Sequence, residues 1–293
     1  MQSAALLLPL CLGAIGTAVV TAPTSPMNMH GAIDSTMEPL GPLFVDHPTT
    51  VGADEANANV LAETSVLALD AAPRPQTGFH LEVRTTVVAL AASYGLTDTL
   101  DASLVLPIVT ETVDLRARVG PAAGHTRFSA AGVSDLGARL KYQVAPYLAA
   151  TLQATFPTGD ASRGLGTGHY WLLPGLAADL PVGDRVLLSA QVAGNLNLSY
   201  AKQSGLTYGV GLSTLLGPVA LVAELLGSVG VQNALTVFGV QYGDGATVDL
   251  AVGLRVPLPR GFMVFLAGTY AVDHDGVRPA GVSPVLGVGW DVP

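Results

Sequence analysis

The stretch RVLLSAQVAGNLNLSY, residues 185–200, alternates between two kinds of side chain along its length. Its even positions are apolar or small, and most of its odd positions are Ser, Gln or Asn. A period of two is typical of a β-strand whose two faces meet different surroundings. Leu188 and Val192 lie on one face and Gln191 and Asn195 on the other, so the fold depends on which face meets water.

The composition favours contact with lipid. Charged residues are 12% of the 293-residue chain and hydrophobic residues 49%, with a mean hydropathy of +0.48, whereas charge makes up about 25% of a soluble domain. Beyond the N-terminus no apolar run reaches the ~18 residues that a spanning helix needs. Because only helices and closed barrels satisfy every backbone group in a bilayer, the sequence predicts an all-β, transmembrane, antiparallel up-and-down β-barrel.

Charge, cysteine content and motifs exclude several function classes. The net charge of −9, with Lys141 and Lys202 as the only lysines, argues against nucleic acid as a partner. The single cysteine, Cys11, allows no disulfide or thiolate metal site. No G-x-S-x-G, H-E-x-x-H or C-x-x-C motif occurs, so we expect neither an enzyme nor a cofactor. The glycines of GLGTGH, 164–169, predict a flexible loop, and Asp273-His274-Asp275 predicts a solvated loop tip without a metal.

The chain divides into three parts. Residues 1–22 form an apolar stretch that ends in Val-Thr-Ala, which predicts a signal peptide for export. Residues 23–58 are rich in Pro, Asp and Glu without a sustained period, and predict an irregular leader. Residues 59–293 consist of strands and turns, and predict the barrel itself.

Twelve strands are expected in the barrel. Tight links at 94–98, 144–146, 182–184, 217 and 258–261 alternate with mostly longer links at 70–78, 112–132, 158–169, 201–204, 232–245 and 273–281. Short turns at one end and long loops at the other are typical of outer-membrane barrels, in which the short turns are periplasmic. The expected strands are 60–69, 79–93, 99–111, 133–143, 147–157, 170–181, 185–200, 205–216, 218–231, 246–257, 262–272 and 282–290.

The more apolar face of each expected strand is taken to meet lipid, which leaves its charges in the lumen. In 79–93 this places Leu81 and Val83 outside, and in 133–143 it places Leu140 outside. A charge at the bilayer midplane costs about 2–4 kcal/mol, so the two faces are kept apart. The predicted lumen-facing residues are Glu82, Arg84, Asp101, Arg139, Lys141, Gln191, Asn195, Glu224, Asp249 and Arg255. Two interpretations explain these inward charges: they pair with one another across a narrow lumen, or they select which solutes pass.

Aromatic residues on the outward face predict two girdles at the membrane interfaces. Those expected near the loop end are Phe79, Phe156, Tyr200, Tyr208 and Tyr270, and those near the turn end are Tyr142, Phe262 and Trp290.

Some inward positions are apolar and need a cover if the pore is wet. They are Val88, Leu90, Val105, Val109, Leu187, Met263 and Phe265. We hypothesise that part of the leader enters the lumen beside the strands bearing Val105 and Phe265. The alternative is that these side chains line a path for apolar solutes.

Three stretches resemble a known family: SYGLTDTLDASLVLPI (93–108), GVSDLGARLKYQ (132–143) and FPTGDASRGLGTGHY (156–170). They are similar to outer-membrane transporters grouped with the meta-pathway of phenol degradation, from about residue 59 to the C-terminus. The resemblance implies a barrel in the outer membrane of a Gram-negative bacterium that moves hydrophobic or aromatic compounds. Barrels of this kind commonly end on an aromatic residue that the barrel assembly machinery recognises, whereas here Asp-Val-Pro follows Trp290.

The sequence therefore favours a channel for passive uptake of small, hydrophobic or aromatic solutes, with outer-membrane lipid, solute and the assembly machinery as partners. Twelve strands predict a passage wider than in filled eight-stranded barrels and narrower than in open porins. The alternative function is a closed barrel with a structural or surface adhesion role. A secreted soluble β protein is a third interpretation.

Overall fold

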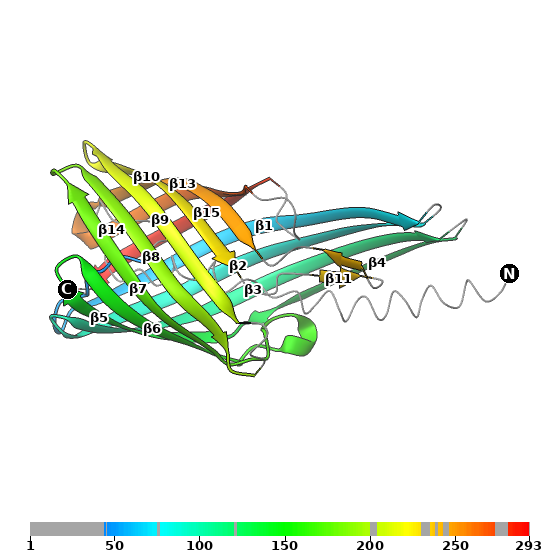
Figure 1. Ribbon diagram of the computed structural model, residues 1–293, viewed down its shortest axis with the longest axis horizontal. Coiled ribbons are helices and arrows are strands. Elements are labelled where there is room, and N and C mark those ends of the chain that lie inside the picture. The colour runs from blue at the N-terminus through cyan, green and yellow to red at the C-terminus, as the bar shows by residue number, and fades with distance from the viewer. Residues whose placement is uncertain are drawn as a thin grey trace.

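The computed structural model describes residues 44, 46–74, 77–119, 122–199, 204–229, 235–237, 240–242, 246–272 and 281–292. Antiparallel strands make up most of these residues (Figure 1). The strands are β1 (Ala56–Arg74), β2 (Thr77–Thr97), β3 (Leu100–Val119), β4 (Ala122–Val133), β5 (Leu136–Ala145), β6 (Leu148–Phe156), β7 (Trp171–Val182), β8 (Val186–Asn197), β9 (Gly205–Leu216), β10 (Val219–Val229), β11 (Leu235–Val237), β12 (Val240–Tyr242), β13 (Thr247–Leu258), β14 (Phe262–Ala271) and β15 (Val282–Val292).

The main sheet closes on itself. It contains 13 strands in the order β2-β1-β15-β14-β13-β10-β9-β8-β7-β6-β5-β3-β4, and an additional pairing of β2 with β3 completes the ring. Because β4 and β5 both pair with β3, on the side away from β2, they occupy one position in the ring, which leaves a closed barrel of 12 strands. This confirms the predicted fold class, and each of the twelve expected strands coincides with a strand of the barrel.

The separation of β4 from β5 is a local irregularity opposite Pro107. Val105 pairs with Gly137 and Ile108 with Val133, so three residues, 134–136, stand opposite two. An extra residue of this kind is a β-bulge, which bends a strand and increases its twist. The Ser134 N–H donates to the Pro107 carbonyl at 2.8 Å and keeps the two strands joined across the irregularity.

The two ends of the barrel differ. At one end, called the turn end, short connections of two or three residues join β2 to β3, β5 to β6, β7 to β8, β9 to β10 and β13 to β14, as predicted. At the other end, the loop end, the expected links 70–78 and 112–132 are wrong, because most of their described residues continue the strands. Apolar and charged side chains alternate through 113–117, and Val113 and Leu115 are buried, so nothing in this stretch interrupts a strand.

The continued strands form a sheet that projects past the rest of the barrel (Figure 1). β1 pairs with β15 only as far as Glu63, and β3 pairs with β5 only as far as Val105. Beyond these points β1, β2, β3 and β4 pair with one another alone. We call residues 64–74, 77–87, 109–119 and 122–133 the β1–β4 extension.

An apolar cluster lines one side of the barrel interior, on the adjacent strands β10, β13, β14, β15, β1, β2 and β3. Its members come from strands far apart in the sequence, and Phe265 packs against them at the edge. The buried residues of the cluster are Phe44, Leu61, Ala89, Ala91, Val105, Val222, Leu226, Ala251, Ala267 and Val285. Phe44 precedes every strand, so the cluster joins the interior wall to the segment in front of β1.

Candidate functional site

Each strand of the barrel buries one face and exposes the other. In β5, Arg139 and Lys141 are 2% and 0% exposed, whereas Leu140 and Tyr142 are 47% and 52% exposed. The same alternation places Asp101 of β3 on the buried face. Since the inner face of a closed barrel lines its lumen, charged side chains lie inside and apolar side chains cover the outside.

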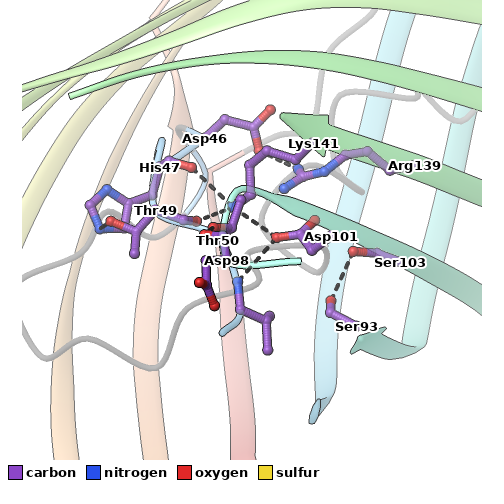
Figure 2. Close-up of polar contacts among 11 residues, drawn as sticks. Asp46, His47, Thr49, Thr50, Ser93, Asp98, Asp101, Ser103, Arg139 and Lys141 are labelled. Carbon is purple, nitrogen blue, oxygen red and sulfur yellow. Dashed lines mark hydrogen bonds and ion pairs between the residues drawn. The ribbon is translucent and has the colours of Figure 1, made fainter. Parts of the chain in front are cut away.

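A segment that precedes β1 lies inside this wall. We call Phe44 and residues 46–51 the inner segment. The ammonium group of Lys141 donates hydrogen bonds to the carbonyls of Thr49 at 2.6 Å and His47 at 3.1 Å (Figure 2). It also lies 3.8 Å from the carboxylate of Asp101, and both side chains of that ion pair are fully buried. Lys141 therefore connects the inner segment to β3 and β5.

Two further charged contacts hold the inner segment. The carboxylate of Asp46 forms an ion pair with the guanidinium of Arg139, and the Asp46 N–H donates to the side-chain carbonyl of Gln191 at 2.7 Å. The imidazole of His47 contacts the carboxylate of Asp179 on β7. Buried charges are costly unless paired, so these contacts compensate charges on the inner segment and on the wall together.

Phe44 combines a polar and an apolar contact. Its N–H donates to the two carboxylate oxygens of Glu224 at 2.8 and 3.1 Å. Its side chain is 4% exposed and belongs to the apolar cluster with Val105, against which Phe265 packs. The inner segment thus lies beside the two strands for which the sequence predicted a cover, where Val105 is fully buried and Phe265 is partly buried.

The inner segment is fixed to the turn end where it meets β1. The Thr50 hydroxyl donates to the Asp98 carbonyl at 2.9 Å, and the Asp54 N–H donates to the Gly95 carbonyl at 3.1 Å. The Gly95 N–H in turn donates to the Glu55 carbonyl at 3.0 Å. A Cβ on Gly95 would lie 1.9 Å from the Gly52 oxygen, so this close approach requires glycine.

At the loop end, residues 157–170 fold inward around the carboxylate of Asp135. This carboxylate accepts hydrogen bonds from the N–H groups of Gly159 at 3.0 Å and Thr167 at 2.6 Å, and from the Thr167 hydroxyl at 2.7 Å. A Cβ on Gly166 would lie 2.4 Å from an Asp135 oxygen. Leu165 is 3% exposed and packs with Val109 of β3 and Ala130 of β4. In this loop, Gly166 leaves room for the backbone to surround a carboxylate.

The same loop contains a short 3-10 turn, Ala161–Arg163, that Asp160 caps. The Ser162 hydroxyl donates to the Asp160 carboxylate at 2.6 Å and the Ser162 N–H at 3.1 Å. These donors hold the pKa of Asp160 below its usual value, the hydroxyl contributing most. The loop is therefore shaped by its own hydrogen bonds as well as by Asp135.

Part of the buried wall is polar but not paired with other described residues. The side chains of Gln153, Thr155, Ser189 and Asn195, on β6 and β8, contain buried polar atoms that have no hydrogen-bond partner within the described structure. Gln153 lies directly opposite Arg139 in the sheet. Buried polar atoms normally find a partner, so these groups are suited to bind water or a polar group of a solute in the lumen.

Most predicted lumen residues lie on the buried parity of their strands. Asp101, Arg139, Lys141, Asn195, Glu224 and Arg255 are at most 2% exposed, and Gln191 and Asp249 are partly buried. The first six of these thus have almost no contact with solvent.

The prediction is wrong for β2. Leu81 and Val83 are buried, and Arg84 and Glu82 lie on the opposite, outward face with side chains 61% and 38% exposed. Leu90, also predicted inward, is 40% exposed, and Val88 shares its parity. Around Arg84 the assignment failed because this part of β2 belongs to the β1–β4 extension, where the outward face carries charge, and Val88 and Leu90 continue the same parity into the wall.

The predicted girdle residues with described side chains lie on the outward parity. Near the loop end Phe156 packs edge-on against Tyr170 with ring centroids 6.4 Å apart, and near the turn end Phe262 stacks on Trp290 at 5.7 Å. The exposed members are Phe156, Tyr270, Tyr142, Phe262 and Trp290, and Tyr208 is partly buried. Tyr200 and the side chain of Phe79 lie outside the described residues.

Sequence reasoning missed the residues that arrange the interior. The sequence places Asp46 and His47 only within an irregular leader, and it indicates no role for Asp135 in the stretch 132–143. The one usable signal was the set of inward apolar side chains, which called for a cover. Residues 56–58, also assigned to the leader, belong to β1.

Among the described residues, no helix is long and apolar enough to span a membrane. The same residues contain no group of three or more His, Cys, Asp or Glu side chains arranged to hold a metal ion.

No protein-family model and no curated protein matches the chain. Solved structures do. An outer-membrane channel from Pseudomonas putida F1 has a TM-score of 0.60 and 17% identity, covering 84% of this chain and 98% of its own. The Ralstonia pickettii toluene transporter TbuX has a TM-score of 0.51 and 12% identity, covering 93% of this chain and 99% of its own. At these identities the similarity shows a shared fold and nothing more.

Proposed function

We propose that this chain is an outer-membrane channel for the passive uptake of small hydrophobic or aromatic solutes. The observation that carries the proposal is a closed barrel with an apolar outside and a charged inside, whose interior is occupied by a segment that belongs to no strand. A barrel with a purely structural role could fill its lumen with the side chains of its own strands. Here removal of one segment would open the interior.

The solute class follows from what the wall offers. Val105, Phe265 and their neighbours present an apolar surface, while Gln153 and Asn195 present hydrogen-bonding groups without a partner among the described residues. An aromatic solute with one polar substituent fits both. The resemblance to phenol-pathway transporters and the fold shared with a toluene transporter support this class.

The inner segment is proposed to restrict the passage. Its contacts with Lys141, Arg139 and Glu224 are polar and charge-assisted, so they are strong in a dry interior and can be exchanged for water when the segment moves. Export through residues 1–22, insertion by the barrel assembly machinery and residence in the outer membrane complete the proposal.

Conductance and liposome swelling test the proposal on matched deletions. The Δ23–51 variant removes the inner segment, and the Δ23–43 variant retains it together with the contacts to Lys141. We expect Δ23–51 to conduct more than Δ23–43, and swelling to favour apolar over charged solutes. Equal conductance of the two deletions would argue against a restricting role for the segment. Absence of permeation by every solute in every variant would remove the transport function.

A surface adhesion or structural role is the second candidate, and the β1–β4 extension favours it. Within the described residues, the outer edges of β4 and of β1 beyond Glu63 pair with no other strand. Such edges can pair with a strand of another protein. Deleting 66–82 and 111–130 would abolish adhesion and spare solute flux if the two functions are separate.

A further inference from the structure

The outward face of the β1–β4 extension gathers arginines in an acidic protein. The chain has 13 lysines and arginines against 22 acidic residues. Four of the arginines, Arg84, Arg116, Arg118 and Arg127, are exposed on this one sheet. They share the parity opposite to buried Leu81, Val113 and Leu115, so all four lie on the same face.

The register of the sheet brings these side chains together. Arg84 lies opposite Thr112, Asp114 opposite Arg127, and Arg116 opposite His125. Side chains directly opposite on an antiparallel pair are about 5 Å apart at Cβ. The arginines therefore form one continuous surface rather than separate charges, and we call it the arginine face.

Acidic neighbours orient part of the arginine face without covering it. Arg84 lies 3.3 Å from the carboxylate of Glu82, and Arg116 lies 3.1 Å from that of Asp114. Both arginine side chains remain more than 60% exposed. Arg127 has no ion pair or hydrogen bond with another described residue. Guanidinium groups held this way keep free donors for a planar anion such as phosphate.

The arginine face lies just beyond the apolar belt of the barrel. The outward face changes in character from the wall toward the tip of the extension. Leu104 and Ile108 are exposed and apolar. Next comes a row of paired threonines, Thr64, Thr86 and Thr110, and beyond that row lie Arg84 and Arg127. At about 3.4 Å per residue and a tilt of ~45°, Arg84 and Arg127 are roughly 10–15 Å above Ile108 along the membrane normal. The headgroup region extends about 5–8 Å beyond the hydrocarbon core on each side of a bilayer, so the arginine face begins at the outer edge of this region.

We propose that the arginine face binds the phosphate groups of the phosphorylated glycolipid, lipopolysaccharide, in the outer leaflet. The inference rests on the proposed function, because it takes the barrel to lie in the outer membrane with its loop end outward. Clusters of basic residues at headgroup level attract anionic lipids, at about 1 kcal/mol for each charge. The contact anchors the extension against the membrane surface and fixes the height of the barrel in the bilayer.

Lipid binding to the full chain in detergent tests the inference. The probes are bis-phosphorylated lipid A and the same lipid without phosphates, with affinity read from native mass spectrometry. The test variant is Arg116→Gln with Arg127→Gln. The matched control is Arg185→Gln with Arg260→Gln, which removes two exposed arginines from the turn end. We expect the test variant to lose about fivefold in affinity for each arginine, and the control to change little.

Three outcomes would overturn the inference: equal affinity for the two lipids, equal loss in the control variant, or full displacement of lipid A by an equal concentration of inorganic phosphate. Heat-modifiable migration on gels and solute flux are measured on the same preparations. If the test variant keeps both its solute flux and its affinity for lipid A, the lipid site is refuted and the proposed channel function is unaffected. Absence of solute flux through the unmodified protein would count against the channel function itself.

Discussion

The wall of the barrel and the β1–β4 extension share β1, β2 and β3 but place most of their charges on opposite faces. Around Lys141 the charges point inward and leucines point outward, whereas around Arg84 the charges point outward and Leu81 points inward. The period of two is the same in both regions. What differs is the chemistry of the exposed side chains, which are apolar around the wall, as lipid requires, and charged around the extension, as water or headgroups require. Alternation therefore identifies a strand, and its surroundings decide which face is polar.

The largest expected difference between the wall and the extension is in the reactivity of introduced cysteines. Leu90 and Glu82 lie on the same outward face of β2, eight residues apart. We expect the Glu82→Cys variant to react fully with a membrane-impermeant thiol reagent and the Leu90→Cys variant to stay unreactive, because lipid covers Leu90. Both are made in a Cys11→Ser background. Equal reactivity in reconstituted protein would place both positions in water and contradict the boundary.

Ion pairs provide the next largest contrast. The Lys141–Asp101 pair is fully buried, and the Arg84–Glu82 pair is 61% and 38% exposed. The Lys141→Met variant leaves Asp101 without its cation and should cost about 3–5 kcal/mol in free energy of unfolding. The Arg84→Met variant should cost at most about 1 kcal/mol. Urea titration in lipid vesicles measures both, and comparable costs would mean that Asp101 is hydrated in the lumen.

An added arginine distinguishes the two outward faces. Leu152, in the middle of β6, is 44% exposed on the outside of the wall. The Leu152→Arg variant should lose about 2–4 kcal/mol, because the charge enters hydrocarbon. The Ser129→Arg variant, on the outward face of the extension, should change stability by no more than about 0.5 kcal/mol. Unfolding in the same vesicles makes the comparison direct.

The smallest effect is expected from acid. A hydrogen bond from His125 and contacts with Arg116 hold the pKa of Asp114 below its ordinary value of 3.8. A lowered folded-state pKa gives stability that is present above the unfolded value and is lost as pH falls through the folded value. We therefore expect the β3–β4 hairpin to exchange amide protons faster below about pH 4 relative to the wall. An Asp114→Asn variant should lack this change.

Twelve strands and the short turns could be predicted because they depend on local patterns. The alternation between apolar residues such as Leu188 and polar residues such as Gln191 can be recognised without knowing how the strands pair. In β5 and β13 even the inward charges Arg139 and Arg255 were identified, since a lipid-facing charge is costly. The same rule failed for Arg84 because the rule requires lipid, and the length of a hairpin beyond the membrane is not encoded in its alternation.

The inner segment could be anticipated but not located. Uncovered inward positions such as Val105 showed that something must fill the lumen, yet Asp46 and His47 carry no periodic pattern that marks them as buried. Their partners Arg139, Asp179 and Gln191 are about 90 to 145 residues away in the sequence. Asp135 was missed for a related reason, because a carboxylate that shapes a loop looks like any polar residue between strands.

The sequence by itself determined that this chain forms strands, that each strand has a polar and an apolar face, and that the apolar faces suit a bilayer, because these properties depend on residues two apart. The closed tertiary structure decided what occupies the interior, where Lys141 meets the carbonyls of Thr49 and His47. It also decided where the wall ends and the arginine face begins. These depend on contacts between distant segments and on the medium at each height, which no local period specifies.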